Sequence, residues 1–305
     1  MLTLTPTSPS EIRLERPFPP VAGVEHRFVE VRGLRVHVAE AGQGEPLVML
    51  HGWPQHWYEW RFQIPVLAQH YRVICPDLRG FGWTDAPASG YDKETLAGDI
   101  IALLDALGLE QVRFMGHDWG GWIGFLIGLR QPDRIRRHLA LNIAPIWPKV
   151  DWRVPIASAR FGYMFKIAAP LYGAWLVQHR PGFVHHLLTR TATRAEGWPA
   201  AELHAFSDQF QNPARARASV HLYRTFLAQE FFPVLFGRYH TQRLKTPTLL
   251  LFGAKDFAIA TSWLRGYEPY VDDFKIELVE GVGHFIADEQ PDLVNQRALA
   301  FFGAP

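Results

Sequence analysis

The stretch VRFMGHDWGG, residues 112–121, decides the fold. Its apolar start predicts a buried strand over Val112–Met115, and a helical pattern follows from about Gly121. Between them, glycines at 116 and 120 flank Asp118 at the spacing of a sharp strand-to-helix turn, in which the central residue is strained and neighbouring side chains would clash. The side chain of Asp118 is therefore expected to stand clear of the carboxyl end of the strand, beside helix N–H groups that favour negative charge.

A carboxylate in this position predicts displacement chemistry at saturated carbon. It is ionised at neutral pH without help, whereas a serine hydroxyl needs a base to become a nucleophile. A carboxylate attacks carbonyls unproductively, but it displaces a leaving group from saturated carbon and so forms an alkyl ester. A base must then activate water against that ester. The simpler alternative is that Asp118 only caps the helix behind it.

Two later segments supply candidates for that base and for a group that orients it. The segment GVGHF, residues 281–285, places His284 after the last predicted strand, and the pKa of histidine suits a base near neutrality. The segment LLLFGAKD, residues 249–256, ends in Asp256, which is placed to accept the ring N–H of His284. Taken singly, the histidine is explained equally well as a structural residue, and the aspartate is better explained as a turn residue. Their order at three strand ends predicts a triad of Asp118, Asp256 and His284.

The loop HGWP, residues 51–54, is expected to stabilise the negative charge that ester hydrolysis develops. Fixed backbone donors must hold such an oxyanion, and the N–H groups of Trp53 and Trp119 are placed to do so. Trp53, Trp119 and Phe285 are also expected to contact the substrate. Taken alone, the His-Gly pair indicates only a turn. Its position shortly before the segment DLRGFGWTD, residues 77–85, favours the role of an oxyanion loop.

Along most of the chain, short apolar runs alternate with longer helical patterns, which predicts a mainly parallel eight-stranded sheet with helices on both faces. A helix is predicted over Thr95–Leu107. Residues 146–230 show helical patterns without a convincing strand, so they are predicted to form a helical cap inserted into a core made of residues 1–145 and 231–305. The predicted strands are His26–Val31, Leu34–Glu40, Leu47–Leu50, Arg72–Cys75, Val112–Met115, Leu139–Ile143, Thr248–Phe252 and Lys275–Val279.

The composition excludes several classes of protein. The 305 residues carry a formal net charge of +1, which gives no electrostatic footprint for nucleic acid or an anionic membrane. No apolar run approaches the ~20 residues that a membrane helix needs. Cys75 is the only cysteine, which excludes an intrachain disulfide and a cysteine-based metal cluster. The first residues lack the pattern of a secretory signal, so a cytoplasmic location is expected. The oligomeric state stays open.

Together these segments resemble the α/β-hydrolase-fold epoxide hydrolases, close relatives of the haloalkane dehalogenases. The resemblance spans nearly the whole chain and rests on HGWPQHWYEWR, DLRGFGWTDAP, GHDWGG, LFGAKDF and GVGHF, in that order. It implies the α/β-hydrolase fold with its helical cap. It also implies a hydrolase that adds water to an apolar epoxide, giving a vicinal diol through an alkyl ester on Asp118, without a metal or organic cofactor.

The resemblance further implies two cap tyrosines that donate hydrogen bonds to the epoxide oxygen. Such donors make physical sense, because a ring alkoxide is a poor leaving group unless its charge is stabilised as it forms. Tyr223, in HLYR, matches the second tyrosine of the pair. Tyr163, in FGYM, is our choice for the first, with Tyr172 as the alternative.

Two other functions stay open. A haloalkane dehalogenase would use the same Asp118 but needs two halide donors, of which Trp119 is one and Trp147, Trp152 or Trp175 a candidate for the second. A fluoroacetate dehalogenase is disfavoured, because an arginine should then stand where Trp119 does. The other alternative is a catalytically silent binding protein that kept the fold. It is disfavoured because nucleophile, acid, histidine and oxyanion loop are all present.

Overall fold

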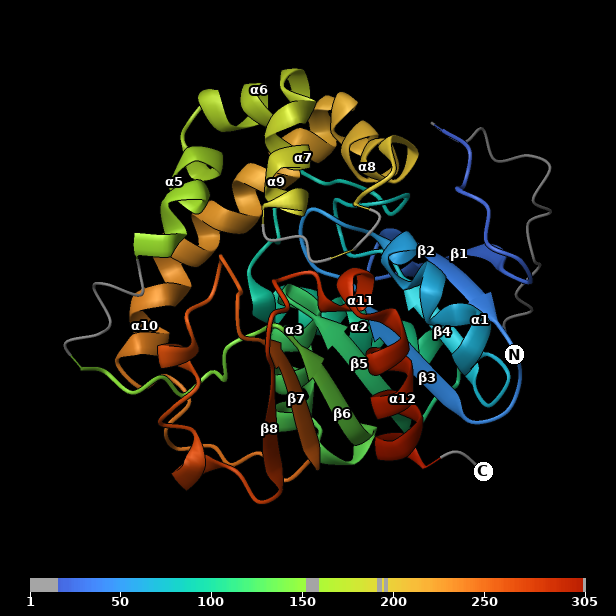
Figure 1. The fold of residues 1–305 in the computed structure, drawn as a ribbon, viewed down its shortest axis with the longest axis vertical. Coiled ribbons are helices and arrows are strands. Elements are labelled where there is room, and N and C mark those ends of the chain that lie inside the picture. Colours follow the sequence, from blue (N-terminus) through green and yellow to red (C-terminus); the bar gives the residue numbers. More distant parts are fainter. Residues whose placement is uncertain (1–15, 152–158, 191–193, 195–196, 304–305) are drawn as a thin grey trace.

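One eight-stranded sheet organises the molecule (Figure 1), as the sequence predicts. The structure is a computed structural model that describes residues 16–151, 159–190, 194 and 197–303. The strand order is β1-β2-β4-β3-β5-β6-β7-β8. The strands are β1 (Glu25–Val31), β2 (Leu34–Ala41), β3 (Pro46–Leu50), β4 (Arg72–Pro76), β5 (Val112–His117), β6 (Ile135–Leu141), β7 (Thr248–Gly253) and β8 (Phe274–Val279).

The sheet is mainly parallel. Two pairings at one edge, β1 with β2 and β2 with β4, are antiparallel, and the pairings from β4 through β3 to β8 are parallel. The hairpin formed by β1 and β2 turns at Arg32 and Gly33, which both have positive φ. Because parallel strands run in one direction, the carboxyl ends of β3, β5, β7 and β8 lie at one edge of the sheet, and the loops after them carry the predicted residues Trp53, Asp118, Asp256 and His284.

Helices cover both faces of the sheet. One hydrophobic core packs β5 against α2 and α3, and a second packs it against α1 and α12. Consecutive residues of a strand point to opposite faces, so Phe114 belongs to the first core and Met115 to the second. Both are fully buried, which explains why this strand reads as a continuous apolar run. These helices are α1 (Ile64–Leu67), α2 (Lys93–Ala106), α3 (Trp119–Arg130), α11 (Ile286–Glu289) and α12 (Pro291–Phe302).

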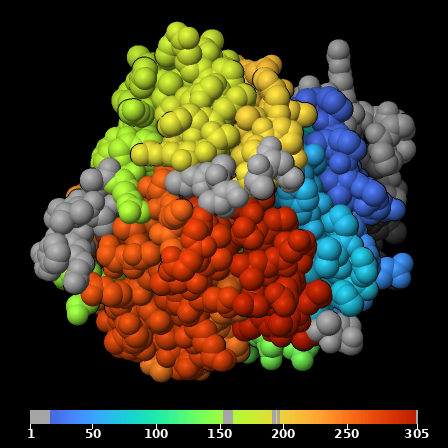
Figure 2. Space-filling model, in the orientation of Figure 1, coloured from blue at the N-terminus to red at the C-terminus, as the bar shows by residue number. Residues whose placement is uncertain are grey.

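A layer of helices lies over one end of the sheet (Figure 1), and Figure 2 shows its yellow-green and gold surface resting on the orange and red part of the core. We call α5–α10 the helical layer. It consists of α5 (Gly162–Ala168), α6 (Tyr172–His179), α7 (Pro181–Thr189), α8 (Ala200–Ser207), α9 (Pro213–Thr225) and α10 (Phe231–Leu235). These helices continue to Leu235, past the predicted cap boundary at 230. In the described part of the chain, no helix combines the length and apolar character that crossing a bilayer requires.

Short 3-10 helices occupy several connections. They are Trp57–Phe62, Pro132–Arg134, Ala159–Phe161, Asp208–Gln211, Thr261–Trp263 and Glu268–Tyr270.

A π-helical segment, Phe226–Glu230, joins α9 to α10 and ties the helical layer to the core. The carboxylate of Glu230 accepts hydrogen bonds from the Nζ and the backbone N–H of Lys93, both across 2.8 Å. The same Nζ donates to the carbonyl oxygen of Leu222 across 3.1 Å. Lys93 is fully buried at the start of α2. Its charge is therefore compensated within the protein, where an unpaired ammonium would be costly.

The structure corrects the predicted position of β6. The strand was expected at Leu139–Ile143, but it runs from Ile135 to Leu141. Its start was missed because Arg136 and Arg137 are exposed and interrupt the apolar pattern. Its end was placed too late because Asn142 takes a positive φ of 42°, which terminates the strand.

Candidate active site

Asp118 occupies the sharp turn between β5 and α3, with φ 48° and ψ −122°. A side chain at Gly120 would put its Cβ 2.0 Å from the carbonyl oxygen of Leu50, and one at Gly52 would put its Cβ 2.4 Å from the Cβ of Asp118. Glycine is therefore required at both positions. The carboxylate makes no helix-capping hydrogen bond beyond the first residue of α3, Trp119. This argues against the alternative that Asp118 serves only as a helix cap.

The two predicted oxyanion donors contact the carboxylate of Asp118. The N–H of Trp53 donates to Oδ2 across 3.2 Å, and the N–H of Trp119 also donates to the carboxylate. Burial raises the pKa of Asp118 above its ordinary value, against the lowering effect of His284, His117 and these two N–H groups. Two fixed N–H groups thus bind the carboxylate of Asp118, but burial keeps most of the surrounding solvent away from it.

The raised pKa of Asp118 has a consequence for stability. Since this carboxyl has a higher pKa in the folded protein than in the unfolded chain, it favours the folded state when protonated, and that contribution is lost as the pH rises through the raised pKa. Asp118→Asn is therefore expected to unfold at a higher temperature than the wild type at about pH 8, with the gap closing on acidification. Thermal unfolding by circular dichroism at several pH values measures this. A variant that is less stable than the wild type at pH ~8 would contradict the prediction.

His284 is oriented by Asp256. Its Nδ1 lies 2.7 Å from Oδ2 of the carboxylate, and Asp256 is 1% exposed. The other oxygen, Oδ1, accepts the N–H groups of Ala258 and Ile259 at 2.7 and 2.9 Å. Although burial acts to raise it, His284 and these hydrogen bonds hold the pKa of Asp256 below its usual value. An ionised Asp256 keeps the proton of a neutral His284 on Nδ1 and leaves Nε2 as its basic nitrogen.

Asn142, directly after β6, is a site residue that the sequence analysis missed. Its Nδ2 donates to Oδ2 of Asp256 across 2.8 Å and to the carbonyl oxygen of Gly283 across 3.1 Å. It therefore fixes the acid and the loop that carries the histidine at the same time. A signal was available, because Asn142 is a polar residue at the end of a buried strand, as Asp256 is.

The sequence analysis also missed His117 and Glu59, which form a buried ion pair next to His284. The Nε2 of His117 donates to the carbonyl oxygen of His284 across 2.9 Å, and its Nδ1 lies 2.8 Å from Oε1 of Glu59. Although burial acts to lower it, the ion pair with Glu59 raises the pKa of His117 to about 9. This buried cation lies beside the carboxylate of Asp118 and helps to lower its pKa. No sequence pattern links His117 to Glu59, although both lie in the segments quoted above.

Tyr163 on α5 and Tyr223 on α9 face each other from the helical layer. Their ring centroids are 5.8 Å apart and their hydroxyls are hydrogen-bonded. Burial, with a further contribution from the charge of Asp118, raises the pKa of both hydroxyls well above their ordinary value, so both stay protonated and are able to donate. Tyr172 is 48% exposed at the start of α6, where it stacks on Trp175. The structure therefore brings Tyr163, and not Tyr172, to Tyr223.

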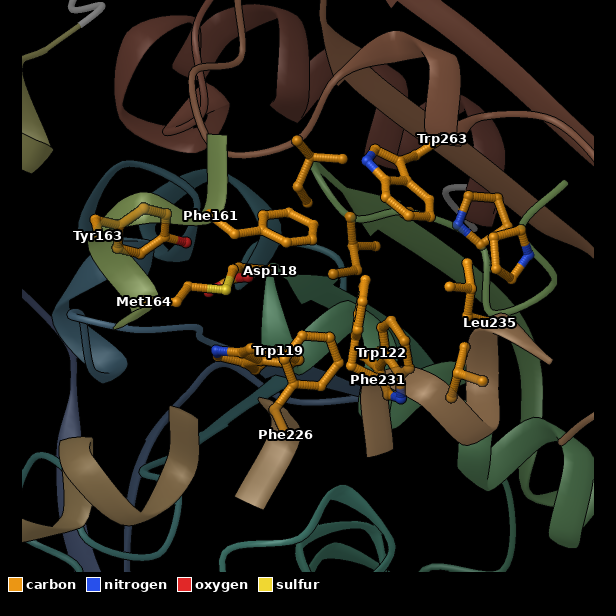
Figure 3. A pocket seen from close by; sticks show the side chains of 16 residues that line it. Asp118, Trp119, Trp122, Phe161, Tyr163, Met164, Phe226, Phe231, Leu235 and Trp263 are labelled. Atoms are coloured by element: carbon orange, nitrogen blue, oxygen red, sulfur yellow. The ribbon is translucent and has the colours of Figure 1, made fainter. Parts of the chain in front are cut away.

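An apolar cavity opens beside Asp118 (Figure 3). It contains about 610 Å³ of space between the protein atoms, its mouth included. Apart from Asp118, the side chains around it are aliphatic, proline, methionine or aromatic. The cavity is lined by Asp118, Trp119, Trp122, Ile143, Ala144, Pro145, Pro148, Phe161, Tyr163, Met164, Phe226, Phe231, Val234, Leu235, Ile259 and Trp263.

Of the three residues predicted to contact substrate, Trp119 lines this cavity, whereas Trp53 and Phe285 do not. The ring of Trp53 packs edge-on against Tyr223 at 5.4 Å, and its Nε1 donates to Oγ of Ser219 across 2.9 Å. Phe285 is buried against the imidazole of His284, with ring centroids 5.0 Å apart. Both rings therefore support residues of the site and do not form its wall.

Two of the tryptophans considered as second halide donors, Trp147 and Trp175, do not line the cavity at Asp118. The Nε1 of Trp147 donates to the carbonyl oxygen of Tyr239 across 2.9 Å. Trp175 is 43% exposed and stacks on His179. Trp152 lies outside the described residues. Neither of the two described side chains lines the cavity at Asp118.

Comparison with known proteins identifies relatives of this chain. Residues 45–291 match the family model for the α/β hydrolase fold. The chain is 31% identical to a soluble epoxide hydrolase of Corynebacterium sp. (strain C12), over 92% of this chain and 97% of that protein. It is 30% identical to epoxide hydrolase 4 of Mus musculus, over 90% of this chain and 79% of that protein.

Solved structures show the same likeness. The ligand-free structure of the epoxide hydrolase CorEH superposes with a TM-score of 0.81 at 30% identity, covering 92% of this chain and 98% of that one. The epoxide hydrolase VrEH1 from Vigna radiata superposes with a TM-score of 0.77 at 28% identity, covering 92% and 98%. The chain therefore belongs to the α/β-hydrolase fold family and is a hydrolase related to the epoxide hydrolases.

Proposed function

We propose that the protein adds water to an apolar epoxide and releases a vicinal diol, through an alkyl ester on Asp118. One observation carries this proposal: the carboxylate of Asp118 meets an apolar cavity beside two tyrosine hydroxyls that stay protonated. A carboxylate nucleophile suits attack on saturated carbon, and the hydroxyl donors suit a departing alkoxide. The names of the relatives support the same activity.

In the first half-reaction, the epoxide oxygen accepts hydrogen bonds from Tyr163 and Tyr223. The oxygen of Asp118 that the N–H of Trp53 does not hold attacks one ring carbon, and the bond from that carbon to the epoxide oxygen breaks. One tyrosine gives its proton to the alkoxide as it forms. The product is a hydroxyalkyl ester of Asp118.

In the second half-reaction, His284 takes a proton from water, and the resulting hydroxide attacks the ester carbonyl carbon of Asp118. The N–H groups of Trp53 and Trp119 hold the oxyanion. Its collapse breaks the bond to the alkyl oxygen, which takes the proton from His284 and leaves as the diol. The proton released as the carboxylate of Asp118 re-forms returns to the tyrosine, so that the sum is the addition of one water.

The helical layer fits the role of a cap. It supplies both tyrosines and one wall of the cavity, and a closed apolar site strengthens the electrostatic interactions within it. We propose that the cap comprises residues 146–230. We also propose that the protein is located in the cytoplasm.

Two substrates assayed side by side test this proposal. Purified protein is expected to convert styrene oxide to its diol, and to release no halide from a bromoalkane above the blank. Asp118→Ala, which lacks the nucleophile, should form no diol. Halide release without diol would favour the dehalogenase alternative. Neither product would favour the silent binding protein, and either result would overturn the proposal.

A further inference from the structure

The cavity at Asp118 extends in one direction. Figure 3 shows Asp118 and Tyr163 at one end and Leu235 and Trp263 at the other, with the ring of Phe161 between them. The far wall comes from α10 and from the loop after β7, so it is built jointly by the helical layer and the core. A ring-opening reaction at Asp118 therefore has this hydrocarbon-lined space beside it for the substituents of the epoxide.

The character of that space is aromatic and uncharged beyond Asp118. Six aromatic rings line it besides that of Tyr163, those of Trp119, Trp122, Phe161, Phe226, Phe231 and Trp263. The Nζ of Lys93 lies 4.5 Å from the ring centroid of Trp119, but its charge is paired with the carboxylate of Glu230. Among the described residues, Asp118 is the one charged side chain that lines the space, and the indole N–H of Trp263 is a donor without a partner. An ionised substituent would lose its hydration there without gaining a counter-ion, whereas an aryl group gains edge-to-face contacts as well as burial.

Rings that do not line the cavity pack against the reacting groups. The ring of Trp53 lies 6.1 Å from that of Phe210, and its position is fixed by the hydrogen bond to Ser219. The ring of Phe257 lies 5.9 Å from that of Tyr163 and 5.6 Å from that of His284. A large group on the second ring carbon would have to displace these side chains, at a cost in packing.

We propose that the substrate is a terminal epoxide with one large hydrocarbon arm, best an aromatic one, and that this arm lies in the space between Phe161 and Trp263. Epoxides with a large group on both ring carbons are excluded. The inference rests on the proposed epoxide hydrolysis and adds to it the class of substrate.

A substrate series tests the inference. With terminal epoxides of lengthening alkyl arm, starting from propylene oxide, kcat/KM is expected to rise about fourfold per methylene until the cavity is full, because each methylene leaves water for an apolar site. Styrene oxide should exceed trans-stilbene oxide, which carries a phenyl group on each ring carbon, by roughly 100-fold. Equal turnover of the two would overturn this inference alone. No diol from any epoxide, propylene oxide included, would overturn the proposed function and this inference with it.

Matched variants at the far end of the cavity give a second test. Leu235→Trp fills the end of the space and is expected to lower the preference for the longest alkyl epoxide over propylene oxide by about tenfold. Phe236→Trp makes a related change at the next residue, which is 77% exposed and outside the cavity, so it should keep the wild-type preference. Leu235→Phe is a milder substitution should the tryptophan prevent folding. An unchanged preference in a folded Leu235 variant would overturn the inference.

Discussion

His284→Ala is expected to trap the enzyme as a covalent adduct. The variant keeps Asp118 and both tyrosines, so ring opening proceeds, but it lacks the base that activates water against the ester. We expect kcat to fall by about 10²–10⁴-fold, while the enzyme gains the mass of one substrate molecule. Intact-protein mass spectrometry after incubation with styrene oxide measures the gain, and peptide mapping should assign it to Asp118.

Two control variants make this result specific. The double variant Asp118→Ala, His284→Ala has no nucleophile and should show no gain in mass. His204→Ala removes an exposed histidine of the helical layer and should turn over like the wild type. An unmodified His284→Ala enzyme that still forms diol at the wild-type rate would refute the assigned role of His284.

Removing the tyrosine hydroxyls is expected to slow the other half-reaction. Tyr223→Phe and Tyr163→Phe each take away one donor to the developing alkoxide, and the loss of one such donor costs roughly 10²–10³-fold in rate. The double variant should lose ring opening almost entirely. The attack of water on the ester should be spared, since neither hydroxyl takes part in it. Single-turnover mixing followed by tryptophan fluorescence separates the two, because the rings of Trp53 and Trp119 lie 5.4 and 5.9 Å from that of Tyr223.

Tyr172→Phe is the matched control for these variants. It removes a hydroxyl of the same kind from the exposed start of α6 and should leave both rates unchanged. If Tyr172→Phe slowed ring opening as much as Tyr163→Phe does, the choice between the two tyrosines would be reversed. If the rate of ester hydrolysis fell together with that of ring opening, the hydroxyls would serve to hold the helical layer in place and not to donate to the epoxide.

The sharp turn at Asp118 could be predicted from the sequence because its requirements are local. The positive φ of the central residue and the close contact of Gly120 with Leu50 restrict the amino acids along a few positions, and that restriction is visible as spacing. The positions of Asp256 and His284 followed for a related reason. Parallel strands bring their carboxyl ends together, so a polar residue at each end becomes a neighbour of the others.

Other features depend on how distant elements dock and leave no local pattern. Tyr163 and Tyr172 are both aromatic residues on short helices, and only the packing of α5 and α6 against α9 distinguishes them. Phe285 follows His284 immediately, yet its ring packs behind the imidazole and not in the cavity. The pairing of His117 with Glu59 joins a sheet strand to a distant 3-10 helix, which no periodicity reveals.

The number of residues in the π-helical segment between α9 and α10 determines which side chains of α10 face the cavity. Each residue advances an α-helix by about 100° around its axis, so deleting or inserting one residue in Phe226–Glu230 would rotate α10 by roughly that angle against α9. Phe231 and Leu235 would then turn away, and other side chains would take their place opposite Trp122. A change of one residue in the length of this segment would thus replace the side chains that α10 contributes to the cavity wall, while Asp118, His284 and Tyr223 keep their positions.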